Sequence, residues 1–360
     1  KVSDEAKPFI HFTTTSFDIV DTANSLRYKK AAEELILPTL KELEKLLMNI
    51  ALREKDTVQV GRTHGQHAVP VTFGFSIAEY VSRLGNRIQE VEAKSEQLKG
   101  KIAGAVGAYN ASHLFFEDPE SFEADVLNEL DLEASSHSTQ IVEPEYMTDF
   151  VHALVSAFGV IANFSDDMRN LQRSEIAEVG EHFGEDQVGS STMPHKRNPI
   201  NYENVKSMWK EFMPRMMTLY QDQISEHQRD LTNSASSRFI PELIVGLLAS
   251  VNRLIRVSKN LVVDHKNIQQ NFDQNKEMIV AEPLYILLAS YDHPDAHEAV
   301  RKLTLEAEEK DKTLRELVVE KEELKPYVEK FNDKQKKLLT NPTKYIGIAS
   351  EKTEKVVEKY

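Results

Sequence analysis

The segment from residue 145 to residue 175 reads EYMTDFVHALVSAFGVIANFSDDMRNLQRSE, and its spacing decides the fold class. Apolar and small side chains recur there in steps of three and four, at Met147, Val151, Leu154, Phe158, Ile161, Ser165 and Met168. Such steps place one stripe of side chains along a helix, which is typical of the seam of a helical bundle. A second stripe has the same steps and comprises Ile36, Leu40, Leu43, Leu47 and Ile50.

The rest of the chain is also predicted to be helical. Gly and Pro together contribute only 26 of the 360 residues, which leaves room for long helices. Alternating strand patterns are nearly absent, and residues 57–60 form the one candidate short strand. The spacing therefore predicts an all-α fold, with at least three helices longer than about twenty residues, well above the usual length. The expected helices cover 21–54, 72–100, 145–175, 199–226 and 240–263.

The character of the sequence changes near Val262, where long stripes give way to shorter amphipathic pieces. We therefore expect two domains. Residues 1–262 would form the central helical bundle, and residues 263–360 a smaller helical C-terminal domain.

Composition excludes several classes of function. The chain has no cysteine, so disulfides, thiolate metal sites and cysteine nucleophiles are excluded, and its histidines lack the clustered spacing of metal ligands. The net charge of −14 argues against a nucleic-acid surface, although a local basic cluster could still bind a small anion. The strongly apolar stretch from Leu243 to Val251 is too short to span a bilayer, and Lys1–Pro8 has no signal-peptide core. We therefore expect a soluble protein of the cytoplasm that binds no membrane.

The most distinctive motif is Gly189-Ser190-Ser191-Thr192-Met193-Pro194-His195-Lys196-Arg197-Asn198-Pro199. It combines small residues, hydroxyl groups, two fixed positive charges and two prolines. We expect the stretch from about residue 184 to residue 197 to be mobile. A loop of this kind, carrying a potential base and cations, could close over an anion. Composition alone, however, favours an ordinary basic surface loop.

This motif resembles the signature of the fumarase/aspartase superfamily, whose members eliminate fumarate from succinyl compounds. Its His-Lys-Arg version resembles the adenylosuccinate lyase and carboxymuconate cycloisomerase families. Two further segments resemble the superfamily's other blocks, in the right order. The first is Thr15-Ser16-Phe17-Asp18 with Asp21-Thr22-Ala23, and the second runs from Gly61 through His64 to Gly74.

Other segments resemble adenylosuccinate lyases in particular. Thr139-Gln140-Ile141 is similar to their substrate-binding glutamine segment, and Gln228–Ser234 with Arg238 is similar to their phosphate-binding segment. Ala281-Glu282-Pro283 and Tyr345-Ile346-Gly347 resemble the C-terminal domain of the bacterial type. The resemblance thus extends over essentially the whole chain.

The resemblance implies a lyase of purine nucleotide biosynthesis that works by base-catalysed β-elimination. This chemistry needs a base, an acid for the leaving nitrogen and positive charge at the developing dianion. Ser190 matches the base, with Ser191 as the neighbouring alternative, and His64 matches the acid because imidazole exchanges protons near neutral pH. Glu203 matches the carboxylate that orients this histidine.

The remaining site residues are implied by the same resemblance. Lys196 and Asn198 would bind the succinyl carboxylates, with Arg197 beside them. Arg229, Ser234 and Arg238 would hold the phosphate, a task that suits the guanidinium group. Four further residues would complete the pocket: Thr15, Ser16, Gln140 and Asn204.

The family also implies a homotetramer in which each active site combines blocks from three subunits. The expected partner is a small purine nucleotide, with no metal, cofactor or nucleic acid. Family members begin with a small helical domain carrying an Arg-Tyr and a His-Asp pair. Neither pair precedes Thr15, and Arg27-Tyr28 lies after the first block, in an expected helix. We therefore expect this domain to be missing, the tetramer to persist and turnover to be slow.

Three other interpretations compete. The chain could be another superfamily lyase or a carboxymuconate-type cycloisomerase, but the Gln140 segment and the segment 228–238 favour a purine substrate. A catalytically silent structural relative would not need Ser190, His64, Lys196 and Glu203. A helical scaffold that binds partners would leave the three ordered motifs as coincidence.

Overall fold

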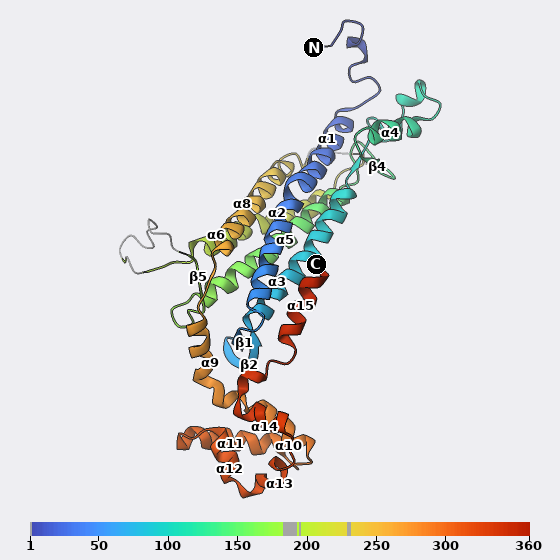
Figure 1. The fold of residues 1–360 in the computed structure, drawn as a ribbon. Coiled ribbons are helices and arrows are strands. Elements are labelled where there is room, and N and C mark those ends of the chain that lie inside the picture. Colours follow the sequence, from blue (N-terminus) through green and yellow to red (C-terminus); the bar gives the residue numbers. More distant parts are fainter. Residues whose placement is uncertain (1, 183–192, 194–195, 229–231) are drawn as a thin grey trace. The chain divides into compact units, whose positions relative to one another are not determined.

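The computed structural model describes residues 2–182, 193, 196–228 and 232–360, and it is dominated by helices (Figure 1). Three helices exceed twenty residues: α3 (Phe73–Glu96), α5 (Glu145–Leu171) and α8 (Phe239–Lys259). The three sheets formed by the described residues each have only two strands. The predicted all-α fold built on long helices is therefore confirmed.

The other elements are shorter. The helices expected at 21–54 and 199–226 are both present, the second interrupted by a 3₁₀ turn (Met213–Arg215). A nearly continuous helix is formed by α1 (Ser16–Ala31), a π-helical turn (Ala32–Ile36) and α2 (Leu37–Arg53). The further helices are α4 (Pro119–Asn128), α6 (Ile200–Phe212), α7 (Met216–Asp222), α9 (His265–Ile279), α10 (Ala281–Ser290), α11 (Ala296–Lys310), α12 (Leu314–Glu320), α13 (Lys325–Val328), α14 (Asp333–Thr340) and α15 (Ala349–Lys359). The strands are β1 (Val58–Thr63), β2 (Gln66–Thr72), β3 (Lys99–Gly100), β4 (Glu133–Ala134), β5 (Val179–Gly180) and β6 (Val262–Val263).

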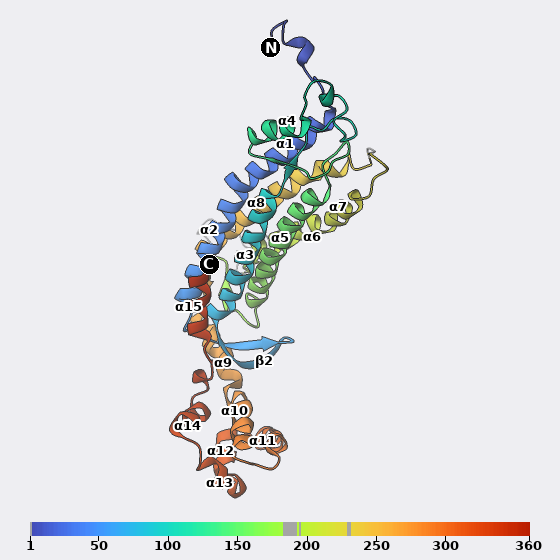
Figure 2. The same ribbon diagram turned by 90° about the vertical axis from the view of Figure 1, so that its right-hand side faces the viewer.

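The chain forms two compact units, each assembled from separate segments. The first unit comprises Lys1–Lys45, Arg83–Asp167 and Asn198–Lys259. Within it α1, α5, α6 and α8 run side by side in both views (Figures 1 and 2). The apolar faces of α5, α6 and α8 are buried because each stripe of side chains faces the neighbouring helices, and Tyr202 of α6 meets Phe164 of α5 edge to face.

The seam predicted from spacing is buried. In α5, Val151, Leu154 and Phe158 have no exposed surface, and in α2 Leu40 and Leu43 have none. Ser165 is tolerated in the stripe because its hydroxyl donates a hydrogen bond of 2.8 Å to the carbonyl oxygen of Ile161, four residues earlier. Among the described residues, one helix, α5, is long and apolar enough to cross a membrane, but its most apolar window is 67% buried inside the protein, as in a core helix.

The second unit comprises Leu46–Ser82, Met168–Arg197 and Asn260–Tyr360. One apolar cluster of this unit joins α10, α11 and α12 through Leu284, Leu288, Leu303 and Leu317. The last helix, α15, returns to an early segment, where the hydroxyl of Ser350 donates to the carbonyl oxygen of Lys55 at 3.0 Å. Residues 260–360 therefore share a unit with two earlier segments, and a boundary at Val262 remains a prediction.

The sequence predicts only part of the first strand of the β1–β2 hairpin. The two strands pair from Val58 with Thr72 to Thr63 with Gln66, well beyond the expected 57–60. Periodicity missed it because polar residues, two glycines and a proline interrupt the alternation after Val60. Val60 packs instead with Phe272 and Ile279 of α9, so a distant partner stabilises the strand.

Gly74 marks a close contact at the start of α3. A Cβ atom at Gly74 would overlap the carbonyl oxygen of Ala51 and the amide nitrogen of Lys55. We predict that Gly74→Ala lowers the free energy of unfolding by about 1–3 kcal/mol, the usual effect of overpacking. Thermal and urea unfolding would measure this loss. Gly180→Ala is the control, since no atom lies within 4 Å of its added methyl group; equal losses in both variants would contradict the steric explanation.

Candidate active site

The first block lies at the start of α1 and is held by a buried charge. The Asp18 carboxylate accepts a hydrogen bond of 2.7 Å from the backbone N–H of Thr15, closing a capping box. Asp18 also forms an ion pair with Lys101, and neither side chain is exposed. The pair therefore anchors the end of α1, which leaves Thr15 half-buried and Ser16 exposed.

Two predicted substrate-binding segments meet in the same unit. The backbone N–H of Gln140 donates to the carbonyl oxygen of Gln228 at 3.2 Å. Six residues beyond Gln228, Ser234 is exposed and lines a cavity, and Arg238 is exposed at the end of a short 3₁₀ helix. The structure thus brings the Gln140 segment to the start of the predicted phosphate-binding segment.

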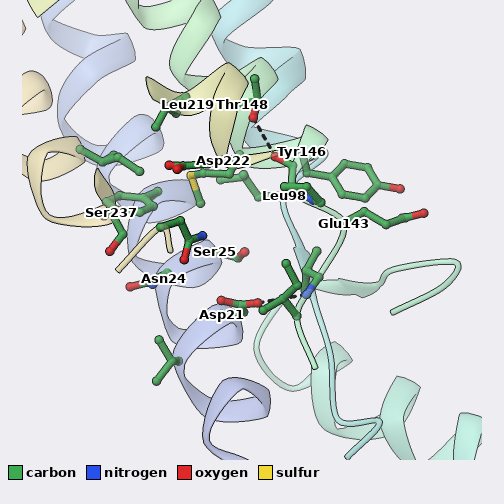
Figure 3. A pocket seen from close by; sticks show the side chains of 18 of the residues that line it. Asp21, Asn24, Ser25, Leu98, Glu143, Tyr146, Thr148, Leu219, Asp222 and Ser237 are labelled. Carbon is green, nitrogen blue, oxygen red and sulfur yellow. Dashed lines mark hydrogen bonds between the residues drawn. The ribbon is translucent and has the colours of Figure 1, made fainter. Parts of the chain in front are cut away.

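The cavity that Ser234 lines measures about 220 Å³ and is shown in Figure 3. Asp21, Asn24 and Ser25 reach it from α1, and Asp222 and Ser237 reach it from later segments. The carboxylate of Asp21 accepts a hydrogen bond of 3.0 Å from the N–H of Val142. Among the described residues, the lining contains no Lys, Arg or His. The cavity therefore suits an uncharged polar group better than a phosphate.

The second block forms the tip of the β1–β2 hairpin. Thr63 pairs with Gln66, so the loop contains only His64 and Gly65. Their φ angles are +54° and +73°, the left-handed values that a tight type I′ turn requires. His64 is exposed at this tip, a position from which its imidazole can reach a substrate. Gly61 lies at the strand's bulge, where a Cβ would approach the carbonyl oxygen of Val69 to 2.6 Å.

Behind this tip, the hairpin is tied to a buried carboxylate. The guanidinium of Arg62 donates two hydrogen bonds, of 3.1 and 2.7 Å, to the two oxygens of Glu178. Burial is the main cause that lowers the pKa of His67, and the Arg62 cation lowers this pKa further, against an opposing effect of Glu178. His67 therefore holds a proton less readily than an ordinary histidine.

Much of the signature motif lies outside the described residues. Ser190, Ser191 and Arg229 belong to the segments 183–192 and 229–231, and the expected mobility of 184–197 falls largely there too. Lys196 and Arg197 are described and exposed. The carbonyl oxygen of Arg197 accepts a hydrogen bond of 3.3 Å from the side chain of Gln172, which ties this end of the motif to the end of α5.

The motif leads directly into α6. Pro199 is the N-cap of this helix, so the helix begins one residue after the start of the expected range 199–226. The N–H of Glu203 donates to the carbonyl oxygen of Pro199 at 3.0 Å, which places Glu203 in the first turn. Glu203 and Asn204 are both exposed, and Asn198 is partly exposed.

The predicted site residues therefore divide between the two units. His64, Lys196 and Arg197 belong to the second unit. The first unit holds Thr15, Ser16, Gln140, Asn198, Glu203, Asn204, Ser234 and Arg238. Pairing of His64 with Glu203 remains a prediction. Sequence reasoning missed Lys101 and Glu178, because each binds a residue far away along the chain and neither lies in a recognisable motif.

The two C-terminal motifs meet in the second unit. The hydroxyl of Tyr345 donates to the carboxylate of Glu282 at 2.7 Å. Burial, together with this hydrogen bond, raises the pKa of Tyr345 to about 12, so the phenol stays protonated. No group of three or more His, Asp or Glu in the described part of the chain is placed to hold a metal ion.

Comparisons with known proteins agree with these motifs. A family described as lyase matches residues 2–213, and one described as adenylosuccinate lyase C-terminal matches residues 225–346. The adenylosuccinate lyase of Pyrococcus horikoshii is 36% identical, over 99% of this chain and 79% of that protein. The adenylosuccinate lyase of Bacillus subtilis is 35% identical, over 89% of this chain and 74% of that protein.

The fold has a counterpart in a solved structure. The 3-carboxy-cis,cis-muconate lactonizing enzyme from Pseudomonas putida has a TM-score of 0.85 and 24% identity, over 99% of this chain and 78% of that one. The likeness to this structure shows the fold. The relatives that are similar in sequence show to which of the families with this fold the chain belongs. The ordered motifs, the bundle and these relatives together show that the chain belongs to the adenylosuccinate lyase family.

Proposed function

We propose that this chain eliminates fumarate from adenylosuccinate, giving AMP, and from the succinylated aminoimidazole carboxamide ribotide. The observation that carries the proposal is the hairpin tip: a two-residue turn presents His64 to solvent, behind which Arg62 is bound to Glu178. A general acid must reach the leaving nitrogen, and a rigid, exposed support meets that need. Relatives named adenylosuccinate lyase supply the substrate class.

The reaction would proceed as a β-elimination. Ser190, or Ser191 beside it, removes a proton from the succinyl carbon next to a carboxylate. Lys196 and Asn198, with Arg197 nearby, hold the succinyl carboxylates and stabilise the dianion that develops. His64, oriented by Glu203, protonates the purine nitrogen as the C–N bond breaks, and fumarate leaves.

The nucleotide would be held by residues outside the reacting centre. Arg229, Ser234 and Arg238 bind the phosphate, and Thr15, Ser16, Gln140 and Asn204 complete the pocket. The acidic lining of the cavity beside Ser234 favours a phosphate position on the Arg238 side of that serine. The carboxymuconate cycloisomerase alternative receives no added support, because the likeness to that enzyme concerns the fold.

We further propose a cytoplasmic homotetramer whose active sites combine residues from three subunits. Large apolar side chains stay exposed on the first unit, where Met217 is 61%, Ile224 82% and Val245 65% exposed. Contiguous apolar surface marks protein–protein contacts, and we propose that these side chains belong to such a surface in the assembly.

The first test removes the acid and the base in turn. We expect His64→Ala and Ser190→Ala each to lower kcat by at least about 10²-fold, the usual effect of losing an acid or base, with a smaller change in KM. The absorbance change on cleavage of adenylosuccinate measures both constants. His113→Ala, an exposed histidine outside the motifs, serves as the control. Normal turnover in either variant would show that its residue is misassigned.

The second test concerns phosphate binding. We expect Arg238→Ala to raise KM about tenfold or more and kcat to change less, because a bidentate contact to the phosphate is lost far from the reacting bond. Arg256→Ala, an exposed arginine at the end of α8, should leave both constants unchanged. An unchanged KM in Arg238→Ala would exclude this arginine from the nucleotide site.

The third test concerns assembly. Light scattering of this 360-residue chain should give four times its mass of 41.0 kDa. Val245→Glu should shift the assembly toward smaller species, since a charge on a contact surface must be desolvated. Helicity by circular dichroism is the control for folding. A monomer that cleaves adenylosuccinate at a normal rate would contradict the shared active site.

A further inference from the structure

Glu178 joins three separate elements through one carboxylate. Its side chain is fully buried and accepts hydrogen bonds from Gln59 at 2.5 Å, from Arg62 at 2.7 and 3.1 Å and from Asn271 at 2.8 Å. Gln59 and Arg62 belong to β1, Asn271 belongs to α9, and Glu178 itself directly precedes β5. A carboxylate has about four acceptor positions, so these four hydrogen bonds saturate it.

The backbone around Glu178 is held as firmly as its side chain. Ala177 has a φ angle of +50°, and its carbonyl oxygen accepts a hydrogen bond of 3.0 Å from the side chain of Asn267. The carbonyl oxygen of Glu178 accepts another, of 2.9 Å, from the N–H of Asp264. Since both the backbone and the carboxylate are anchored to α9 and the residues before it, Glu178 gives β1 a stationary point of attachment.

This attachment lies next to the turn that presents His64. Arg62 pairs with His67 in the rung directly before Thr63 and Gln66, the rung that closes the turn. The pairing register of β1 with β2 shifts between Val60 and Arg62. The hydrogen bonds between the two strands therefore fix the orientation of the hairpin tip only weakly. The bidentate Arg62–Glu178 contact then fixes the direction in which the last rungs, and with them His64, project.

We propose that Glu178 is a positioning residue for the elimination, which holds His64 in place through Arg62 and Gln59. This inference rests on the proposed role of His64 as the acid. Displacement of a catalytic group by about 1 Å can lower a rate by up to about 10²-fold, so a loosened hairpin would affect kcat more than KM. A buried carboxylate that only stabilised the fold would show no such selectivity.

The test uses Glu178→Gln in the full chain, alone and combined with His64→Ala. Glu54→Gln is the matched control: Glu54 is 3% exposed, lies in the same unit, and accepts hydrogen bonds from Arg53, Thr57 and His265, away from the turn. We expect Glu178→Gln to lower kcat about tenfold with KM within about twofold of normal, and to have no further effect once His64 is alanine. Glu54→Gln should lower the unfolding temperature while kcat stays normal.

A spectroscopic signature accompanies the kinetics. Loss of the Glu178 charge leaves the Arg62 cation uncompensated beside His67, so the pKa of His67 should fall below its value in the unsubstituted protein. NMR titration of the histidine ring resonances would follow this change, and it should be absent from Glu54→Gln. If Glu178→Gln does not fold, Arg62→Lys provides the same kinetic test, because it keeps the charge and removes the bidentate contact.

The outcomes separate the two proposals. Slow turnover of His64→Ala with a normal kcat for Glu178→Gln would overturn the positioning role alone. An equal effect of Glu178→Gln in the presence and absence of His64, or an equal loss of kcat in Glu54→Gln, would also overturn it. Normal turnover of His64→Ala would overturn the acid assignment and this inference with it.

Discussion

Burial of α5 is the constraint on which the bundle depends. Phe150, Leu154, Ala157 and Phe158 have no exposed surface, and Ala153 and Ile161 have almost none. These positions share one face, but Val155, Val160 and Ala162, which flank that face, are also at most 9% exposed. The helix α5 is therefore covered on several sides and acts as a central helix. Its neighbours in the first unit need to be apolar on one face only, which leaves their other faces for polar site residues such as Glu203 and Asn204.

Two buried ion pairs complement this apolar packing. Asp18 with Lys101 holds the first block in one unit, and Glu178 with Arg62 holds the second block in the other. Breaking such a pair costs about 3–5 kcal/mol, yet replacing both partners with apolar residues is often neutral or stabilising. Net stability is therefore a poor explanation for either pair. Both instead give a direction to a short segment that carries polar side chains proposed for the site.

The sequence predicted the helices well because their spacing is local information. The stripes at 36–50 and 147–168 needed only steps of three and four, and their core positions are buried. The hairpin carrying His64 was largely missed, since its strands are specified by partners on α9 rather than by alternation. Ser190 and Arg229 lie outside the described residues, so their roles rest on resemblance alone.

The candidate site shows the same division between local and distant information. His64 was recognisable inside a motif, but the left-handed turn that presents it became visible only with the paired strands. The partner of Asp18 lies 83 residues away, and the partner of Arg62 lies 116 residues away. No periodicity links residues across such separations. The sequence therefore identifies the proposed reacting groups, whereas the residues that position them are found only in the folded structure.

The π-helical turn at Ala32–Ile36 between α1 and α2 has an evolutionary consequence. A π turn, with its i→i+5 hydrogen bonds, accommodates one residue more than an α-helical turn, and such turns are frequent at functional sites. Each residue rotates an α-helix by about 100°, because there are 3.6 residues per turn. Losing one residue from a regular α-helical turn would rotate Thr15 and Ser16 by that angle relative to the residues that follow. The wider π turn absorbs its extra residue, so losing one residue here would leave them on the same face. The π turn thus allows a change in length of one residue before α2 without redirecting the first block, which leaves the lineage a tolerated deletion beside the proposed site.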